Sequence, residues 1–337
     1  MNWLSKTLKI LASLLLAFVI FLALLYRSDI AQEEIIEKYS YPESHFIEVD
    51  GVNLHVRFLG EGVPIFLIHG SFSSLHTWDE WQRELSPHFM TISVDLPGHG
   101  LTGPDELKRY TVEDYGQVIL RLAEKLNLPR FHIAGNSMGG AVALQVASTR
   151  PDQVLSLNLL NSSGAPRPTS RTLPSENSSE RESRWVFRLL ENPVFSKILL
   201  KCTPKFLFSM NLKEVYGDPQ RIKAESVDRY FELMLREGNR EATLDRISSK
   251  KDSSIDFERL TMPTLIMWGD LDRWIPVNQA LAFEKGISGS NLIIFEGVGH
   301  VPMEEIPTES VAEYLSFLGV EVRKNYLQAP NYVSYVD

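Results

Sequence analysis

The sequence has little cysteine and no excess of positive charge. Cys202 is the single cysteine among 337 residues, so no disulfide can form within the chain. Acidic side chains outnumber basic ones by 43 to 34, which gives a formal net charge of −9. Proteins that bind nucleic acids usually carry a basic stripe, and this balance therefore argues against such a partner.

Motifs for metal and phosphate sites are missing as well. The chain contains no HExxH sequence, no paired cysteine and histidine spacing, and no glycine-rich phosphate loop ending in lysine. It has no internal repeat, and no protein partner is evident. We therefore expect chemistry that needs neither a metal nor an organic cofactor.

A long apolar run lies near the N-terminus. Residues 10–26 carry no charge, follow Lys6 and Lys9, and precede Asp29. The run is just long enough to span a bilayer. The positive-inside rule places the N-terminus in the cytoplasm and the rest of the chain on the far side, periplasmic or extracytoplasmic. We expect residues 1–28 to be an uncleaved anchor, since no small-x-small site follows; a cleaved signal peptide, which would release a secreted protein, is the alternative.

Short apolar runs alternate with helical patterns after the anchor. Thr111, followed three residues later by Asp114, forms a capping box that starts one of these helices. Strands that alternate with helices indicate βαβ units and a parallel sheet, here preceded by a hairpin. The candidate strands lie at 45–49, 52–59, 64–68, 89–94, 131–134, 154–160, 264–268 and 291–295.

The alternation breaks over residues 162–259. Most of this stretch, from Arg184 to about Ile247, has an amphipathic helical pattern. Because the strand and helix alternation resumes after it, the stretch is an insertion and not a new sheet. Residues 27–43 read as a charged connector, and the tail 323–337 has no clear pattern.

Gly135-Asn-Ser-Met-Gly139 follows a predicted strand and precedes a predicted helix. This G-x-S-x-G pattern is typical of a nucleophilic serine on a sharp turn, where residues two before and two after must be small. We expect Ser137 to be a nucleophile and the Met138 amide to be one donor to the developing oxyanion. The second donor should come from the loop after His69-Gly70, from Ser71 or alternatively from Phe72.

A serine hydroxyl needs a general base and an acid that orients the base. His300 lies directly after the last predicted strand, where its ring can reach the sheet edge. Asp270 and Asp272 both follow the preceding strand, and Asp272 is preferred because the turn should aim the later residue toward the histidine loop. The acid can instead follow the strand at 154–160, but that position holds Asn158 and Asn161 and no carboxylate. The chain order is then Ser, Asp, His.

The other histidines lack such a position. We expect His69 and His99, beside glycines in tight turns, to make structural hydrogen bonds, and His132 to lie in a strand. The acidic pair Glu304–Glu305 is expected to be solvated. Histidines that carry no motif and are expected at the surface are His45, His55, His76 and His88.

Together these motifs resemble the α/β-hydrolase superfamily over about residues 45–320. The resemblance implies a core of eight mostly parallel strands at 41–161 and 260–322, with a helical lid at 162–259. A serine nucleophile implies a branch other than the haloalkane dehalogenases and epoxide hydrolases, which use aspartate. The motifs that carry the resemblance are His69-Gly70 with Trp78, Asp95-Leu-Pro-Gly-His-Gly100, Gly135-Asn-Ser-Met-Gly-Gly140, Trp268-Gly-Asp-Leu-Asp-Arg273 and Gly299-His-Val-Pro-Met-Glu304.

The resemblance implies hydrolysis of a carboxylic ester through an acyl-serine. The anchor and lid are similar to membrane-tethered monoacylglycerol-lipase-like and esterase members, which suggests a hydrophobic, lipid-derived small molecule as substrate. Carbon–carbon hydrolases of ring-cleavage products are an alternative, although they commonly carry a glycine-rich segment and a tryptophan where this chain has Ser71-Phe-Ser-Ser and Val301-Pro-Met. A hydrolase-fold receptor that binds a ligand without turnover is the third possibility.

Overall fold

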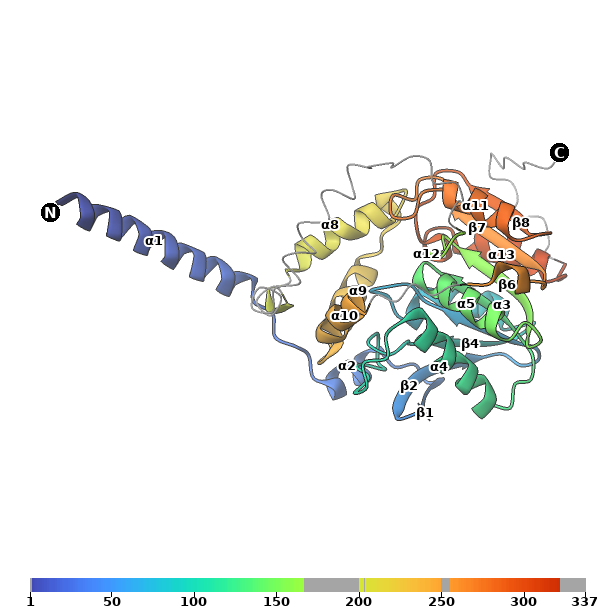
Figure 1. The fold of residues 1–337 in the computed structure, drawn as a ribbon. Coiled ribbons are helices and arrows are strands. Elements are labelled where there is room, and N and C mark those ends of the chain that lie inside the picture. The colour runs from blue at the N-terminus through green and yellow to red at the C-terminus, as the bar shows by residue number, and fades with distance from the viewer. Residues whose placement is uncertain (1, 167–199, 203, 250–254, 322–337) are drawn as a thin grey trace.

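The computed structural model describes residues 2–166, 200–202, 204–249 and 255–321 (Figure 1). It contains an eight-stranded sheet in the order β1-β2-β4-β3-β5-β6-β7-β8. The β1–β2 and β2–β4 pairs are antiparallel and all other neighbours are parallel, which confirms the expected, mostly parallel sheet. The strands are β1 Ser44–Val49, β2 Val52–Leu59, β3 Pro64–Ile68, β4 Met90–Val94, β5 Phe131–Asn136, β6 Val154–Leu160, β7 Thr264–Gly269 and β8 Asn291–Phe295.

Helices precede the sheet, cover it and interrupt it. The first group consists of α1 Asn2–Leu25, α2 Gln32–Tyr39, α3 Asp79–Leu85, α4 Val112–Lys125 and α5 Met138–Thr149. The second group consists of α8 Lys205–Val215, α9 Ala224–Leu235, α10 Asn239–Ser248, α11 Asn278–Gly286, α12 Pro302–Glu305 and α13 Pro307–Phe317. Short 3-10 turns lie at Leu75–Trp78, Pro219–Arg221 and Phe257–Arg259.

The sheet buries both of its faces. Alternate residues of β3 point to opposite sides, so Phe66 joins one apolar core and Leu67 the other. Helices α4, α5 and α11 pack on the first face, and α3 and α13 on the second. The Trp81 and Tyr314 rings stack there, with centroids 5.3 Å apart. The predicted capping box is present at the start of α4, where Thr111 and Asp114 bond reciprocally.

Three helices of the chain between β6 and β7 pack against this core. Leu212 and Val215 of α8 and Tyr230 of α9 join the apolar cluster of the second face, whereas Ala242 of α10 joins that of the first. The position after the sixth strand is the one expected for the insertion. Parts of the predicted 162–259 stretch, namely 167–199, 203 and 250–254, lie outside the described residues, as does the tail 323–337.

The segment expected as a charged connector contains the helix α2, which docks on the insertion. Ile35 is 1% exposed and packs with Leu101 and Leu233 in a small separate cluster. Lys38 pairs with Glu232 of α9 at 2.5 Å. Four of the eight α2 residues are charged, and its apolar face is too short to give a helical pattern in the sequence.

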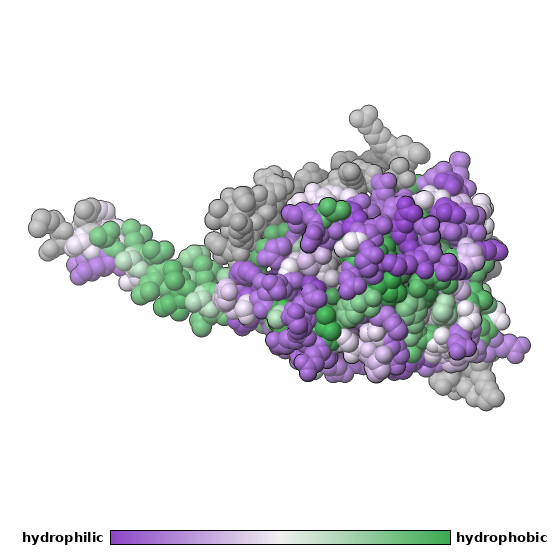
Figure 2. Space-filling model, turned by 90° about the horizontal axis from the view of Figure 1, so that it is seen from below, coloured by the Kyte–Doolittle hydropathy of each residue, from purple (hydrophilic) through white to green (hydrophobic). Residues whose placement is uncertain are grey.

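Helix α1 stands clear of the body, and Figure 2 shows its hydrophobic side chains uncovered. Among the described residues, Ser5–Leu25 is the one segment long and apolar enough to cross a membrane, and none of it is buried. A helix of this kind is either a membrane anchor or a signal sequence.

Candidate active site

Ser137 lies on a strained turn between β5 and α5. Its φ of 56° and ψ of −120° fall in a region of backbone conformation that residues other than glycine seldom adopt. A Cβ at Gly135 would lie 2.1 Å from the Gly139 carbonyl oxygen, and one at Gly139 would lie 2.2 Å from that of Ile68. Both glycines are therefore required for the turn, and α5 begins at Met138, three residues earlier than the apolar pattern indicated.

His300 and Asp272 are hydrogen-bonded to each other. His300 Nδ1 lies 2.7 Å from Asp272 Oδ2, and both side chains are buried. Asp272 Oδ1 also accepts the amides of Trp274 and Ile275 at 2.8 and 2.9 Å. Asp270 is exposed and accepts the Gly297 amide instead. Of the two candidate acids, Asp272 is thus the one beside the ring.

Two asparagines that sequence reasoning did not assign to the site hold these loops in place. Asn161, directly after β6, donates from Nδ2 to Asp272 Oδ2 at 2.7 Å and accepts the Gly269 amide at 3.4 Å. Asn136 Nδ2 donates to the His300 carbonyl oxygen at 2.9 Å. The sequence signal for such a role is a polar residue at the carboxyl end of a strand, but an asparagine there does not by itself indicate a contact with Asp272.

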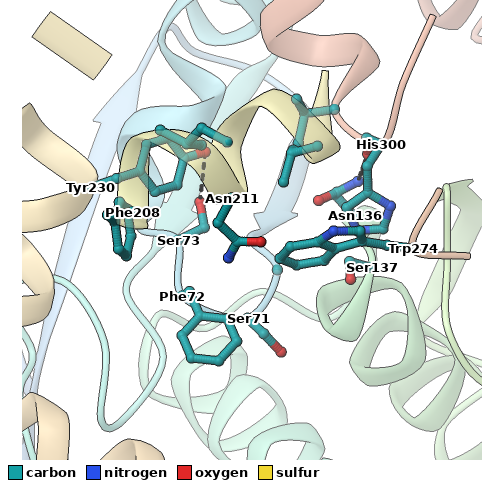
Figure 3. A pocket seen from close by; sticks show the side chains of 14 residues that line it. Ser71, Phe72, Ser73, Asn136, Ser137, Phe208, Asn211, Tyr230, Trp274 and His300 are labelled. Atoms are coloured by element: carbon teal, nitrogen blue, oxygen red, sulfur yellow. Dashed lines mark hydrogen bonds between the residues drawn. The ribbon is translucent and has the colours of Figure 1, made fainter. Parts of the chain in front are cut away.

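Ser137 and His300 line the same cavity, which lies under α8 of the insertion (Figure 3). In the part of the chain that the structure describes, the Ser137 hydroxyl makes no hydrogen bond. The Trp274 ring packs against that of His300, with centroids 5.5 Å apart. The apolar side chains in the lining are Phe72, Phe208, Leu212, Val215, Trp274 and Val301. Its polar members besides Ser137 and His300 are Ser71, Ser73, Asn136, Asn211 and Tyr230.

Free backbone amides lie beside Ser137. A Cβ at Gly70 would come within 3.0 Å of Ser137 Cβ, so the loop after β3 lies directly against the serine. The amides of Met138, Ser71 and Phe72 donate no hydrogen bond to any described residue. The Ser71 hydroxyl donates to Met138 Sδ at 3.5 Å, and Phe72 has a positive φ of 61°. Each of the three amides expected as oxyanion donors is therefore unpaired.

The insertion clamps the histidine loop. The His300 amide donates to the Val215 carbonyl oxygen at 2.7 Å. The Glu305 carboxylate accepts the amides of Gly299, Gly217 and Asp218 at 2.8 to 3.0 Å. The expectation that the Glu304–Glu305 pair is solvated is wrong, because these amides and the surrounding chain enclose Glu305.

Two histidines expected at the surface are buried. His55 Nδ1 lies 2.7 Å from Asp95 Oδ2, and His76 Nε2 lies 2.8 Å from the Tyr39 carbonyl oxygen. Burial lowers the pKa of His76 to about 3. Long-range packing, not a local motif, decides both positions.

The histidine after β3 has the structural role expected of it. His69 Nδ1 donates to the Gly70 carbonyl oxygen, its Nε2 accepts the Leu96 amide, and burial lowers its pKa. This ring therefore stays neutral. Within the described ranges, no group of three histidine, cysteine, aspartate or glutamate side chains is arranged to hold a metal ion.

Comparison with known proteins shows one family. A family model described as alpha/beta hydrolase fold matches residues 63–307. The chain is 27% identical over 266 residues to monoacylglycerol lipase ABHD6 of Bos taurus, covering 77% of this chain and 76% of that protein. It is 26% identical over 262 residues to a 2-hydroxy-6-oxononadienedioate/2-hydroxy-6-oxononatrienedioate hydrolase of Pseudomonas sp, covering 75% and 87%.

A solved structure extends the likeness over almost the whole chain. The crystal structure of a membrane phospholipase A, described as a bacterial virulence factor, matches with a TM-score of 0.67 at 24% identity. The match covers 95% of this chain and 98% of that one. At this identity the likeness shows the shared fold.

Proposed function

Because the chain belongs to the alpha/beta hydrolase fold family, we propose that it is a serine hydrolase that cleaves carboxylic esters through an acyl-serine intermediate. One observation carries the proposal. The unpaired hydroxyl of Ser137 and the His300 ring, itself bonded to Asp272, line one cavity. Hydrolysis is the reaction class that the family supports, and the ester bond is our narrower inference.

In this mechanism Ser137 Oγ attacks the ester carbonyl carbon while His300 Nε2 takes the hydroxyl proton. Asp272 fixes the tautomer through Nδ1 and stabilises the imidazolium that forms. The imidazolium then returns the proton to the departing alcohol, leaving the acyl-serine. Water attacks this ester with His300 again as base, and the acid product leaves.

The oxyanion requires donors that are already oriented when charge develops. The unpaired amides of Met138 and Ser71 support this role, with Phe72 as the alternative to Ser71. Fixed amides of this kind cost no reorganisation at the moment of reaction, and removal of one such donor typically costs about 3 kcal/mol of transition-state stabilisation.

We assign a hydrophobic ester as the substrate class. The side chains of Phe208, Leu212 and Val215 on α8 form one wall, and Trp274 and Val301 extend the apolar lining toward His300. An acyl chain buried against them gains about 0.8 kcal/mol for each methylene removed from water. In this proposal α8 is part of a lid that shapes the acyl site.

We assign α1 as an uncleaved membrane anchor with its N-terminus in the cytoplasm, supported by its exposed apolar surface and by Lys6 and Lys9. Full-length protein should resist extraction by alkaline carbonate, and a chain lacking residues 2–25 should be released. Release of the full-length chain would contradict the anchor and favour a cleaved signal sequence.

The test of the reaction uses the detergent-solubilised full-length protein. Nitrophenyl esters of graded acyl length should be hydrolysed, and a fluorophosphonate probe should label the wild type. Ser137→Ala should abolish both, whereas Ser316→Ala, at an exposed serine on α13, should change neither. Binding of the esters without turnover, or labelling that persists in Ser137→Ala, would refute the proposal and favour a receptor.

A carbon–carbon hydrolase is the second candidate, favoured by the Pseudomonas relative. The same three side chains would serve, but the substrate would be a dienoic acid with a 6-oxo group. Turnover of such an acid by the wild type, with no hydrolysis of any ester in the series, would reverse the ranking.

A further inference from the structure

Arg246 of α10 lies behind the residues expected to stabilise the oxyanion. Its Nη1 contacts Met138 Sδ at 3.7 Å, and its guanidinium lies over the Phe72 ring at 5.4 Å from the centroid. The Ser71 hydroxyl donates to the same sulfur atom at 3.5 Å. One side chain therefore separates the guanidinium from the free amides beside Ser137.

This positive charge has no counterion among the described residues. Arg246 is half-buried, and its Nε is enclosed without a hydrogen-bond partner in the part of the chain that the structure describes. By contrast, Arg240 on the same helix pairs with Asp29, and Asp245 pairs with the exposed Lys108. Buried charges are normally paired because desolvation is costly, so an unpaired guanidinium points to a use for its charge.

The histidines near Arg246 carry no charge of their own. Burial lowers the pKa of Arg246, but an arginine side chain stays protonated at neutral pH. Burial also lowers the pKa of His69 and His99, and the charge on Arg246 acts in the same direction on both. The two rings are therefore neutral, so neither of them places a second charge beside the guanidinium.

We propose that Arg246 is a positioning residue that supplies a fixed positive charge behind the oxyanion site. The inference rests on the proposed function. Arg246 is not among the residues that line the cavity, so it acts through Met138 and Phe72 and not by touching the substrate. Negative charge develops on the carbonyl oxygen only as the tetrahedral intermediate forms, so a cation fixed there stabilises the transition state more than the neutral ester.

The test compares Arg246→Met, which removes the charge, with Arg246→Lys, which keeps it, in the full-length protein. A unit charge that one side chain separates from the developing oxyanion, at an effective dielectric constant near 20, changes the rate by about tenfold to hundredfold. Arg246→Met should lower kcat on a neutral ester by about that factor with KM unchanged. Arg246→Met should weaken the binding of an alkyl boronic acid by the same factor, because the adduct that this acid forms with serine is a tetrahedral anion. Arg246→Lys should keep most of the kcat and most of the affinity for the boronic acid.

Lys108→Gln removes a neighbouring exposed cation and is the matched control, with kcat unchanged. Melting temperatures show which variants fold, and Arg246→Gln replaces the methionine variant if that one does not. Unchanged kcat, or equal losses in the lysine and methionine variants, would overturn the proposal. A loss confined to esters that carry an anionic group would also overturn it, because Arg246 would then bind the substrate. Absence of ester turnover in the wild type would instead refute the proposed function itself.

Discussion

At the residue scale, Asp272 accepts hydrogen bonds from several donors besides the His300 ring. One oxygen accepts two backbone amides, and the other accepts the Asn161 amide group in addition to facing His300. Hydrogen bonds to a carboxylate stabilise its ionised form and restrict its rotation. Asn161 itself adopts a positive φ of 44°, which asparagine and aspartate tolerate better than most residues.

Replacing this donor by an acceptor tests its role. Asn161→Asp preserves shape and backbone preference but places a second carboxylate beside Asp272. Two carboxylates this close share a proton, so we expect kcat/KM near pH 7 to fall about hundredfold or more. Asn127→Asp makes the same change at an exposed residue with φ 54° and should leave kcat/KM unchanged. Comparable kcat/KM values for the two variants would show that Asn161 does not support Asp272.

The two aspartates after β7 should differ sharply in kinetics. Asp272→Asn should lower kcat by about 10³ to 10⁴, since an amide favours the wrong tautomer of His300. Asp270→Asn keeps an oxygen that can accept the Gly297 amide and should stay within about threefold of wild type. Steady-state kinetics on one neutral ester measures both, and a larger loss in Asp270→Asn would reverse the assignment.

At the element scale, α2 and the residues just before it tie the N-terminal segment to the insertion. Asp29 pairs with Arg240 and Lys201, and the backbones of Ile30 and of residues 235–237 exchange hydrogen bonds. The segment that leaves α1 is thereby attached to the helices near the cavity. A soluble fragment should begin near residue 27, because a start at residue 40 would uncover Leu101 and Leu233.

Ile35 provides the stability test of this docking. Ile35→Ala removes a fully buried side chain, and we expect the free energy of unfolding to fall by about 2–4 kcal/mol. The melting temperature should fall by several degrees. Val63→Ala, at an exposed aliphatic residue, is the control and should fall within about 0.5 kcal/mol of wild type. An unchanged stability in Ile35→Ala would show that α2 is not docked in solution.

At the scale of the whole molecule, buried neutral histidines make the fold sensitive to acid. Burial lowers the pKa of His132 from 6.5 to about 4. The unfolded chain takes up a proton there below about pH 6.5, whereas the folded chain does so only near pH 4. The free energy of unfolding should therefore be constant above pH 6.5 and fall as the pH drops toward 4.

Urea unfolding between pH 7.5 and 4.5 measures this slope. His132→Gln should make it shallower, because one of the groups that take up a proton first in the unfolded chain is gone, while His69, His76 and His99 remain. His88→Gln removes an exposed histidine and should retain the slope of the wild type. Equal slopes in all three proteins would mean that His132 does not contribute to the acid sensitivity.

The serine turn, the sheet and the insertion follow from the sequence by itself, because each depends on local spacing. Small residues two places either side of Ser137 permit the turn, and the apolar runs give the strands with errors of one or two residues. The preference for Asp272 over Asp270 also follows from the sequence, whereas the hydrogen bond from Asn161 and the burial of His55 came only from the tertiary structure. So did the docking of α2 and the unpaired charge of Arg246. Each of these depends on contacts between segments far apart in the chain, and on the loss of water that such contacts cause, neither of which a local pattern records.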